Sequence, residues 1–222
     1  MKAKISEIFK SIQGEGLYQA KTQVFIRFFG CNLNCSFCDT KLDFYKYMTV
    51  DEILKSIEIY KDYHSISLTG GEPLLVEISF LKELCYRLKE NSKIIYLETN
   101  GVIYKNLEAL IDYVDIISMD FKLPSSTGLK AFWREHKKFL EIAQKKEVFI
   151  KAVICKDTNS YDIIKSIEII KSVNPKIYFI LQPQNPYEDL LNDKLRYFEN
   201  LCSKNNINVK IVYQLHKKLS IP

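Results

Sequence analysis

Cys31-Asn32-Leu33-Asn34-Cys35-Ser36-Phe37-Cys38 holds three of the six cysteines of the chain, in the spacing Cys-x3-Cys-x2-Cys. Thiolates this close together can converge on one metal centre, whereas three cysteines cannot pair evenly in disulfide bonds. Iron–sulfur clusters are held by cysteine thiolates, usually four. A four-iron cluster held by these three residues would leave one iron free to bind another molecule.

Two other interpretations of the three cysteines stay open. A structural zinc site needs a fourth cysteine or histidine nearby, and the next histidine, His64, lies well outside the usual ligand spacing. The cysteines could also be buried without any ligand, since free cysteine is often buried. The polar residues between them favour a loop over a core strand, so a cluster with an open iron explains the segment best.

The composition of the 222 residues is that of a globular protein, with 47% hydrophobic and 27% charged residues. We expect one domain, residues 1–222. No apolar run reaches the roughly 18 residues of a membrane span, and the polar amino terminus is unlike a signal peptide. With reduced cysteines this predicts a cytoplasmic protein.

The net charge of +5 is mild, and the lysines are spread along the chain rather than gathered in a basic block. This favours a solvated surface over a nucleic-acid-binding face. A slightly positive surface would also help an acidic electron donor or an anionic substrate to approach.

Apolar runs and amphipathic stretches alternate along the chain. Strands are expected at residues 24–29, 65–68, 94–97, 115–119, 148–154, 176–181 and 208–213. Helices are expected at residues 48–60, 77–90, 107–113, 131–145, 161–172 and 189–204. Thr49 and Glu52 form a capping box that predicts the start of the first helix.

Strands that alternate with helices imply a parallel sheet with crossover helices, hence an α/β fold. The six or seven units fall short of the eight of a closed barrel, so we expect an open, partial (β/α) barrel. A doubly wound sheet is the alternative, since the sequence does not distinguish a curved sheet from a flat one. In both folds, sites form at the carboxyl ends of the strands.

Several of the predicted strands end in residues suited to binding. Gly70 and Gly71 would let the backbone approach a ligand closely, and Glu72 adds a carboxylate, although a simple turn explains them as well. Glu98-Thr99-Asn100-Gly101 and Gln182 follow two further strands.

Two features of the later strands are ambiguous from the sequence alone. Ser118, Asp120 and Lys122 alternate, so an extended backbone would place them on one side, at a site or merely at an exposed strand end. Lys151 is unusual inside an apolar strand, and it would point either to the mouth of the barrel or outward to solvent. No partner is evident for His64 or His136.

The cysteine spacing, with the aromatic Phe37 just before the last cysteine, resembles the motif of the radical S-adenosylmethionine (radical SAM) enzymes. Gly70-Gly71-Glu72-Pro73 resembles the Gly-Gly-Glu-Pro motif of the same family. The resemblance implies that Cys31, Cys35 and Cys38 ligate a [4Fe–4S] cluster whose fourth iron binds SAM. Reductive cleavage of SAM would then yield a 5′-deoxyadenosyl radical that takes a hydrogen atom from the substrate.

The resemblance also implies a SAM site and supports the partial barrel. Gly71 and Glu72 would contact the methionyl amino group, and Gln182 would contact the adenine edge. The positions that match SAM-binding positions are Phe37, Asp39, Gly71, Glu72, Ser118, Asp120, Lys122 and Gln182.

Three further segments resemble one branch of this family, the 7-carboxy-7-deazaguanine synthases. They are Gln13-Gly14-Glu15-Gly16, Cys38-Asp39-Thr40 and Gln214-Leu215-His216-Lys217, and the resemblance runs from Ile8 to the carboxyl end. It implies conversion of 6-carboxy-5,6,7,8-tetrahydropterin to 7-carboxy-7-deazaguanine with loss of ammonia, on the route to 7-deazapurines such as queuosine. It also implies Mg²⁺, an electron donor such as a flavodoxin, and a homodimer.

The resemblance implies a substrate site made of Gln13, Gly14, Glu15, Arg27, Thr69, His216 and Pro222, with Thr40 as a ligand of Mg²⁺. Gln13 and Glu15 can pair with the amine and ring nitrogens of a pterin. The Arg27 guanidinium suits a substrate carboxylate, although it could simply cap a strand edge. The Thr40 hydroxyl suits a hard cation that keeps water ligands. His216 and the terminal carboxylate of Pro222 would close over the substrate, unless the tail is disordered.

Two rival functions remain. One is a radical SAM activase that installs a glycyl radical on a partner protein, and the other is a non-enzymatic iron–sulfur or zinc module. Gln13, Glu15 and His216 favour a small-molecule substrate, and the Gly-Gly-Glu-Pro segment argues against a module without catalysis. The scattered cysteines, Cys85, Cys155 and Cys202, are interpreted as core residues.

Overall fold

The computed structural model describes residues 1–38 and 43–219. Its described strands form one nine-stranded sheet in the order β3-β1-β2-β4-β5-β6-β7-β8-β9. In this order, neighbouring strands from β2 through β4 to β9 run parallel, whereas β1 is antiparallel to both β2 and β3. The strands are β1 (Ala3–Ile12), β2 (Thr22–Phe28), β3 (Lys46–Met48), β4 (Ser65–Gly70), β5 (Ile95–Thr99), β6 (Ile116–Asp120), β7 (Glu147–Ile154), β8 (Phe179–Pro183) and β9 (Val209–Ile211).

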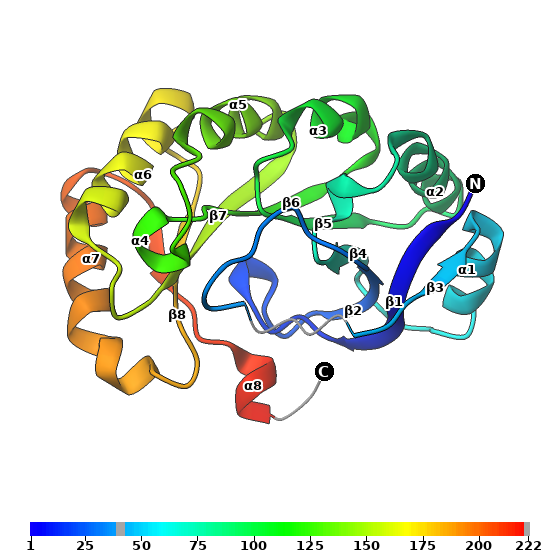
Figure 1. The fold of residues 1–222 in the computed structure, drawn as a ribbon, viewed down its shortest axis with the longest axis horizontal. Coiled ribbons are helices and arrows are strands. Elements are labelled where there is room, and N and C mark those ends of the chain that lie inside the picture. The colour runs from blue at the N-terminus through cyan, green and yellow to red at the C-terminus, as the bar shows by residue number, and fades with distance from the viewer. Residues whose placement is uncertain (39–42, 220–222) are drawn as a thin grey trace.

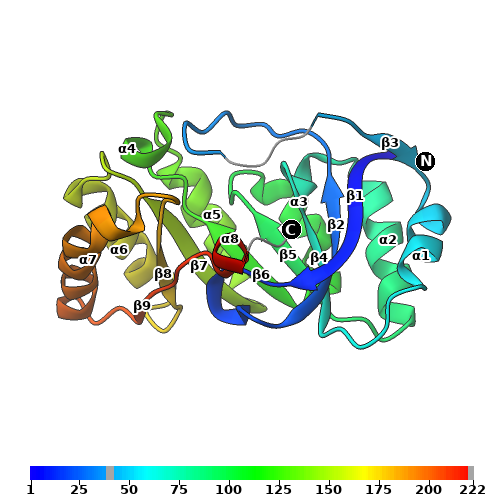
Figure 2. The same ribbon diagram turned by 90° about the horizontal axis from the view of Figure 1, so that it is seen from below.

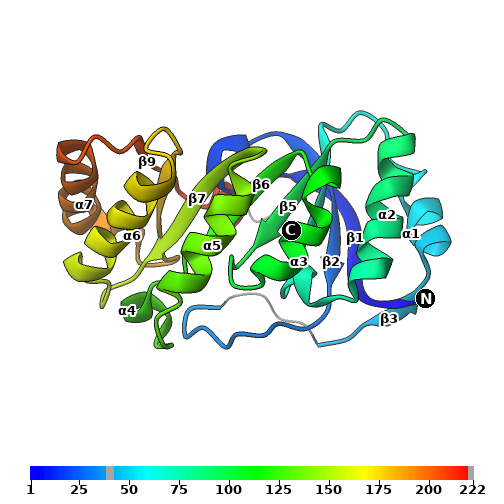
Figure 3. The ribbon, with the colours of Figure 1, turned by 90° about the horizontal axis from the view of Figure 1, so that it is seen from above.

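Helices cover the outer, convex face of this curved sheet (Figure 1). Seen from above, they lie side by side across that face in chain order (Figure 3). The long helices are α1 (Val50–Ile57), α2 (Ile78–Glu90), α3 (Tyr104–Leu110), α5 (Trp133–Ala143), α6 (Ser160–Val173) and α7 (Asn192–Lys204). Two short helices, α4 (Pro124–Thr127) and α8 (Leu215–Leu219), lie away from this layer, with α8 on the open side of the sheet (Figures 1 and 2).

Local side-chain chemistry explains where two of these helices begin. The Thr49 hydroxyl accepts a hydrogen bond from the Glu52 amide, and the Glu52 carboxylate accepts one from the Thr49 amide. The predicted capping box is therefore confirmed at the start of α1. Asn159 caps α6 in a similar way, because its side chain accepts a hydrogen bond from the Asp162 amide.

The main hydrophobic core lies between the sheet and the helices, where parallel strands need cover. A second, smaller cluster lies on the inner face and contains Tyr96, Ile116, Phe149 and Ile180. Leu17 and Tyr18, in the 3-10 helix η1 (Gly16–Tyr18), pack against it. This packing fills one end of the inner face, so polar residues toward the carboxyl ends of the strands can line an opening.

The predicted α/β fold with an open, partial barrel is confirmed, since among the described residues no ladder joins β3 to β9. The strand expected at residues 24–29 is confirmed as β2, but the prediction missed β1, which precedes β2 and pairs with it. The strand was missed because only Ala3 and Ile5 are fully buried in it, and its other residues are largely polar. Met48, expected in a helix, belongs to β3. Within the described residues, no helix is both long and apolar enough to span a bilayer.

Candidate active site

A cleft of about 420 Å³ opens at the carboxyl ends of the parallel strands. Residues from the ends of β4, β5, β6, β7 and β8 line it, as do the loop after β2 and the turn after β1. It is lined by these predicted site residues: Gln13, Gly14, Glu15, Arg27, Cys31, Cys35, Phe37, Cys38, Thr69, Gly71, Ser118, Asp120, Lys122, Gln182 and His216. Asp39, Thr40 and Pro222 lie outside the described residues.

The cysteine loop, residues 31–38, follows β2 and forms one wall of the cleft. Cys31 and Cys38 are exposed, and all three cysteines are free thiols. Both polar groups of Ser36 anchor the loop beside α4, since its amide donates to the Thr127 carbonyl and its hydroxyl to the Ser126 carbonyl, each over 3.0 Å. Burial raises the pKa of the Cys35 thiol to about 11, so the thiol needs a cation or a metal to ionise at neutral pH.

The donor set of the cysteine loop fits an iron–sulfur cluster, because three free thiols line one cleft and none is held in a disulfide. In the described part of the chain, however, no three His, Cys, Asp or Glu side chains lie close enough together to hold a metal ion. This does not count against a cluster, because each of its thiolate ligands binds a different iron and the three thiols need not converge on one ion.

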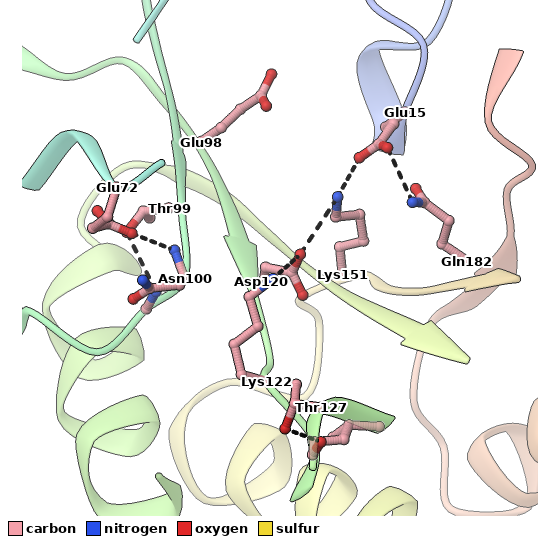
Figure 4. A network of polar contacts seen from close by, with 12 residues as sticks. Glu15, Glu72, Glu98, Thr99, Asn100, Asp120, Lys122, Thr127, Lys151 and Gln182 are labelled. Atoms are coloured by element: carbon pink, nitrogen blue, oxygen red, sulfur yellow. Dashed lines mark hydrogen bonds and ion pairs between the residues drawn. The ribbon is translucent and has the colours of Figure 1, made fainter. Parts of the chain in front are cut away.

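The Gly-Gly-Glu-Pro segment packs directly against the base of the cysteine loop. A Cβ atom on Gly71 would lie 1.9 Å from the Gly30 carbonyl oxygen, so no larger residue fits there. The Glu72 side chain is 1% exposed and accepts hydrogen bonds from the Leu74 amide, the Thr99 hydroxyl and the Asn100 amide (Figure 4). Burial raises the pKa of Glu72 to about 6. Its carboxylate thus holds two loops together, and its predicted contact with SAM stays a prediction.

A row of alternating charges, the charge chain, crosses the cleft through Glu15, Lys151, Asp120 and Lys122 (Figure 4). The Lys151 ammonium pairs with the Glu15 carboxylate and lies 3.5 Å from Asp120 Oδ2. Lys122 Nζ lies 2.9 Å from the same Asp120 oxygen. Lys151 therefore points to the mouth of the barrel, which settles the choice that the sequence left open.

The charge chain fixes the ionisation of Glu15 and Lys151. Burial alone would raise the pKa of Glu15, but the charge and hydrogen bond of Lys151 outweigh it and lower the pKa to about 2. Burial would likewise lower the pKa of Lys151, but Glu15 and Asp120 raise it above its usual value. The pair is therefore charged throughout the physiological pH range.

Glu15 also joins the two ends of the chain. Its Oε1 atom accepts hydrogen bonds from Gln182 Nε2 over 3.1 Å and from Gln214 Nε2 over 2.6 Å. The Leu215 amide donates to the Gly14 carbonyl over 2.9 Å. A Cβ atom on Gly14 would lie 2.0 Å from His216 Nδ1, so only glycine allows this packing. The structure thus brings the predicted carboxyl-terminal residue His216 to the cleft, beside the amino-terminal turn.

Glu98, at the end of β5, was not assigned a role from the sequence. Its carboxylate accepts hydrogen bonds from Gln13 Nε2 over 2.7 Å, from Thr69 Oγ1 over 2.9 Å and from Ser67 Oγ over 3.1 Å. Two of the predicted substrate residues, Gln13 and Thr69, therefore meet at this carboxylate. The sequence signal that could have identified Glu98 is an acidic residue within a buried strand, two positions before Asn100-Gly101.

Three cleft-lining side chains carry a buried polar atom that has no hydrogen-bond partner, namely Arg27 Nε, Asp120 Oδ1 and Gln182 Oε1. Such atoms are rare in folded proteins and indicate a missing ligand or water molecule. Arg27 Nε lies 3.7 Å from Glu7 Oε2 on β1, so the edge-capping interpretation of Arg27 keeps some support. One cationic donor and two acceptors in the wall of this cleft are thus available to a ligand.

The sequence model of the radical SAM superfamily matches residues 25–192. The 7-carboxy-7-deazaguanine synthase of Geobacter sulfurreducens is 37% identical over 242 residues, which cover 97% of this chain and 96% of that protein. That of Thermoplasma acidophilum is 31% identical, with 96% of this chain and 95% of that protein covered.

Among solved structures, QueE from Escherichia coli superposes with a TM-score of 0.68 at 21% identity, covering 95% of this chain and 94% of that one. SuiB from Streptococcus suis, solved with S-adenosylmethionine bound, has a TM-score of 0.58 at 19% identity and covers 82% of this chain and 44% of that one. At these identities the two structures support the fold, and the sequence matches decide the family. This chain belongs to the radical SAM superfamily and, within it, to the 7-carboxy-7-deazaguanine synthases.

Proposed function

We propose that this chain converts 6-carboxy-5,6,7,8-tetrahydropterin to 7-carboxy-7-deazaguanine with loss of ammonia, as a carbon–nitrogen lyase of 7-deazapurine and queuosine biosynthesis. The observation that carries the proposal is a single cleft that joins the cysteine loop to the unpaired Arg27 guanidinium nitrogen and the Glu98 carboxylate. A reaction started at the cluster and a small anionic substrate would share this space. A large protein substrate would not need these inward-facing groups.

Cys31, Cys35 and Cys38 are proposed to hold the [4Fe–4S] cluster of the family. Bound together, the cluster and SAM supply the one-electron chemistry that starts the reaction. The unpaired acceptors Asp120 Oδ1 and Gln182 Oε1 suit the hydroxyl and amino groups of the SAM nucleoside. Phe37, Gly71, Ser118 and Lys122 line the same cleft.

The substrate is proposed to bind between the amino-terminal turn and the ends of β4 and β5. The Arg27 guanidinium would pair with the substrate carboxylate, since it is permanently charged and has an unpaired Nε–H. The Glu98 carboxylate would accept hydrogen bonds from the pterin amine and ring N–H groups, next to Gln13 and Thr69. The Glu15 carboxylate is proposed to pair with the pterin as well, and its contacts with Lys151, Gln182 and Gln214 hold it in place for that role.

Several further parts of the proposal rest on the family alone. Thr40 would ligate a Mg²⁺ ion that also binds the substrate carboxylate, and Asp39 and Pro222 would take part in binding SAM and substrate. We further propose that residues 1–222 form one domain, that the enzyme is a cytoplasmic homodimer, and that an acidic electron carrier such as a flavodoxin reduces the cluster. The net charge of +5 supports the approach of such a carrier.

Arg27→Ala is expected to raise the KM for the carboxypterin about 10–100-fold, because a hydrogen bond to a charged group contributes about 1.5–3 kcal/mol. Steady-state kinetics with SAM saturating measure this change. Iron content and visible absorption should stay at wild-type levels, and Arg27→Lys should recover part of the affinity. An unchanged KM would return Arg27 to a role at the strand edge, paired with Glu7.

The function itself is tested by anaerobic reconstitution with iron and sulfide, followed by SAM, reductant, Mg²⁺ and the carboxypterin. We expect ammonia and 7-carboxy-7-deazaguanine in equal amounts, identified by mass spectrometry. Formation of 5′-deoxyadenosine without either product would keep the superfamily assignment but overturn the substrate. In that case the glycyl-radical activase would become the leading alternative.

A further inference from the structure

Asn100, directly after β5, joins three segments at the wall of the cleft, and its side chain is oriented toward the cysteine loop. The residue is 5% exposed. Its amide nitrogen Nδ2 donates to Asn32 Oδ1 over 2.8 Å and lies 3.9 Å from Cys31 Sγ, within hydrogen-bond range for sulfur. Its backbone amide donates to Glu72 Oε2 over 2.7 Å. Asn100 thus connects the Gly-Gly-Glu-Pro segment to the first cysteine of the motif.

The orientation of the Asn100 amide is fixed by its own oxygen. Oδ1 accepts a hydrogen bond from the Val102 amide over 3.1 Å. A flipped side chain would lose this bond and would place Oδ1 against Asn32 Oδ1, where two acceptors repel. The NH₂ group must therefore face the cysteine loop, with one hydrogen for Asn32 and the other for Cys31 Sγ.

His136 holds Asn100 from the opposite side, inside the helix layer. Its ring is fully buried and stacks on Phe121 with centroids 4.8 Å apart. Nε2 lies 3.2 Å from the Asn100 carbonyl oxygen, which can only accept, so Nε2 carries the ring proton and donates it. Burial lowers the pKa of His136 to about 4, which keeps the ring neutral and this arrangement constant near neutral pH. Asn100 is therefore set by groups on both sides before any cofactor binds.

We infer that Asn100 is a positioning residue that donates an N–H···S hydrogen bond to the Cys31 thiolate and thereby raises the reduction potential of the cluster. The inference rests on the proposed role of Cys31 as a cluster ligand. Reduction adds negative charge to the cluster and its thiolates, and hydrogen bonds to the sulfur atoms stabilise that charge. The Leu33 amide, 3.4 Å from Cys31 Sγ, supplies a second donor of the same kind from within the loop.

Asn100→Ala is expected to make the reduction equilibrium of the reconstituted cluster about tenfold less favourable, a shift of about 59 mV to more negative potential for one electron. The measurement is a redox titration of the holoenzyme followed by electron paramagnetic resonance, without carboxypterin. Asn106→Ala is the matched control, because Asn106 Nδ2 donates to the Leu74 carbonyl over 2.8 Å and does not contact the cysteine loop. The potential of this control should equal that of the wild type.

Asn100→Asp keeps the shape of the side chain, removes its N–H donors and adds a negative charge beside Cys31, so its potential should fall further than that of Asn100→Ala. This second variant keeps the test decisive if the alanine variant binds iron poorly. A wild-type potential in either variant, with iron still bound, would overturn the inference. Because no substrate is present, the result is independent of whether the chain acts on a carboxypterin.

Discussion

Replacement of Cys35 by alanine is expected to abolish both the iron-linked visible absorption and the activity of the reconstituted protein. The cysteine loop offers three thiols to a cluster, and two thiolates do not hold four irons. Cys35 is the least exposed of the three and lies between the other two in sequence. Iron and sulfide analysis after anaerobic reconstitution, together with the absorption spectrum, measures the loss.

Cys85→Ala is the control for this experiment. Cys85 is buried in α2 within the main core, on the opposite side of the sheet from the cleft, and its thiol is expected to bind no iron. The control should lose some stability but keep its iron. A Cys35→Ala protein with wild-type iron content would show that the ligands have been assigned to the wrong residues.

Lys151→Met is expected to destabilise the protein by about 3–5 kcal/mol, the usual cost of removing one partner from a buried ion pair. The Lys151 and Glu15 side chains are only 12% and 20% exposed, and the substitution leaves Glu15 and Asp120 facing each other without a cation between them. Urea denaturation at neutral pH measures the change. Lys89→Met is the matched control, since its pair with Asp115 has side chains 38% and 30% exposed and contributes at most about 1 kcal/mol.

The difference in stability between wild type and Lys151→Met should depend on pH. The folded pKa of Glu15 is about 2, below its usual value of 4.5, so its contribution to stability is present above pH 4.5 and is lost as the pH falls toward 2. In the variant, burial without Lys151 raises the pKa of this carboxyl. The free energies of unfolding of the wild type and the variant should therefore converge at acid pH. A difference that stays constant between pH 7 and pH 3 would mean that the Glu15–Lys151 pair does not cause the destabilisation.

The sequence pattern was sufficient to predict the parallel sheet. Strands that are buried on both faces appear in the sequence as continuous apolar runs, and the helices carry apolar residues at helical spacing. The strand β1, near the edge of the sheet, could not be predicted from such a pattern. β1 has few fully buried residues, so its polar sequence resembles a connecting segment. Its place beside β2 depends on pairing over many residues, which no local pattern specifies.

The candidate site could likewise be predicted from the sequence only in part. The spacing of the cysteines and the glycines of the Gly-Gly-Glu-Pro segment are local features, and they led directly to the cleft. The partners of Glu72 and Glu15 are not local, since Asn100 lies 28 residues from Glu72 and Gln214 lies 199 residues from Glu15. The sequence therefore identified carboxylates at the right strand ends but could not say which were already bound within the protein. Glu98 was noted at a strand end but was given no role, since its partners Gln13 and Thr69 are not local either.

The central proposal is that the cleft turns over a carboxypterin. The resemblance to the 7-carboxy-7-deazaguanine synthases further implies that SAM is regenerated in each turnover and acts as a cofactor rather than as a consumed substrate. The most direct measurement supplies reconstituted wild-type enzyme with excess 6-carboxy-5,6,7,8-tetrahydropterin and reductant but with SAM in small, known amount. The account predicts several molecules of 7-carboxy-7-deazaguanine for each molecule of SAM, with no matching build-up of 5′-deoxyadenosine. Build-up of 5′-deoxyadenosine with no deazaguanine product would contradict it.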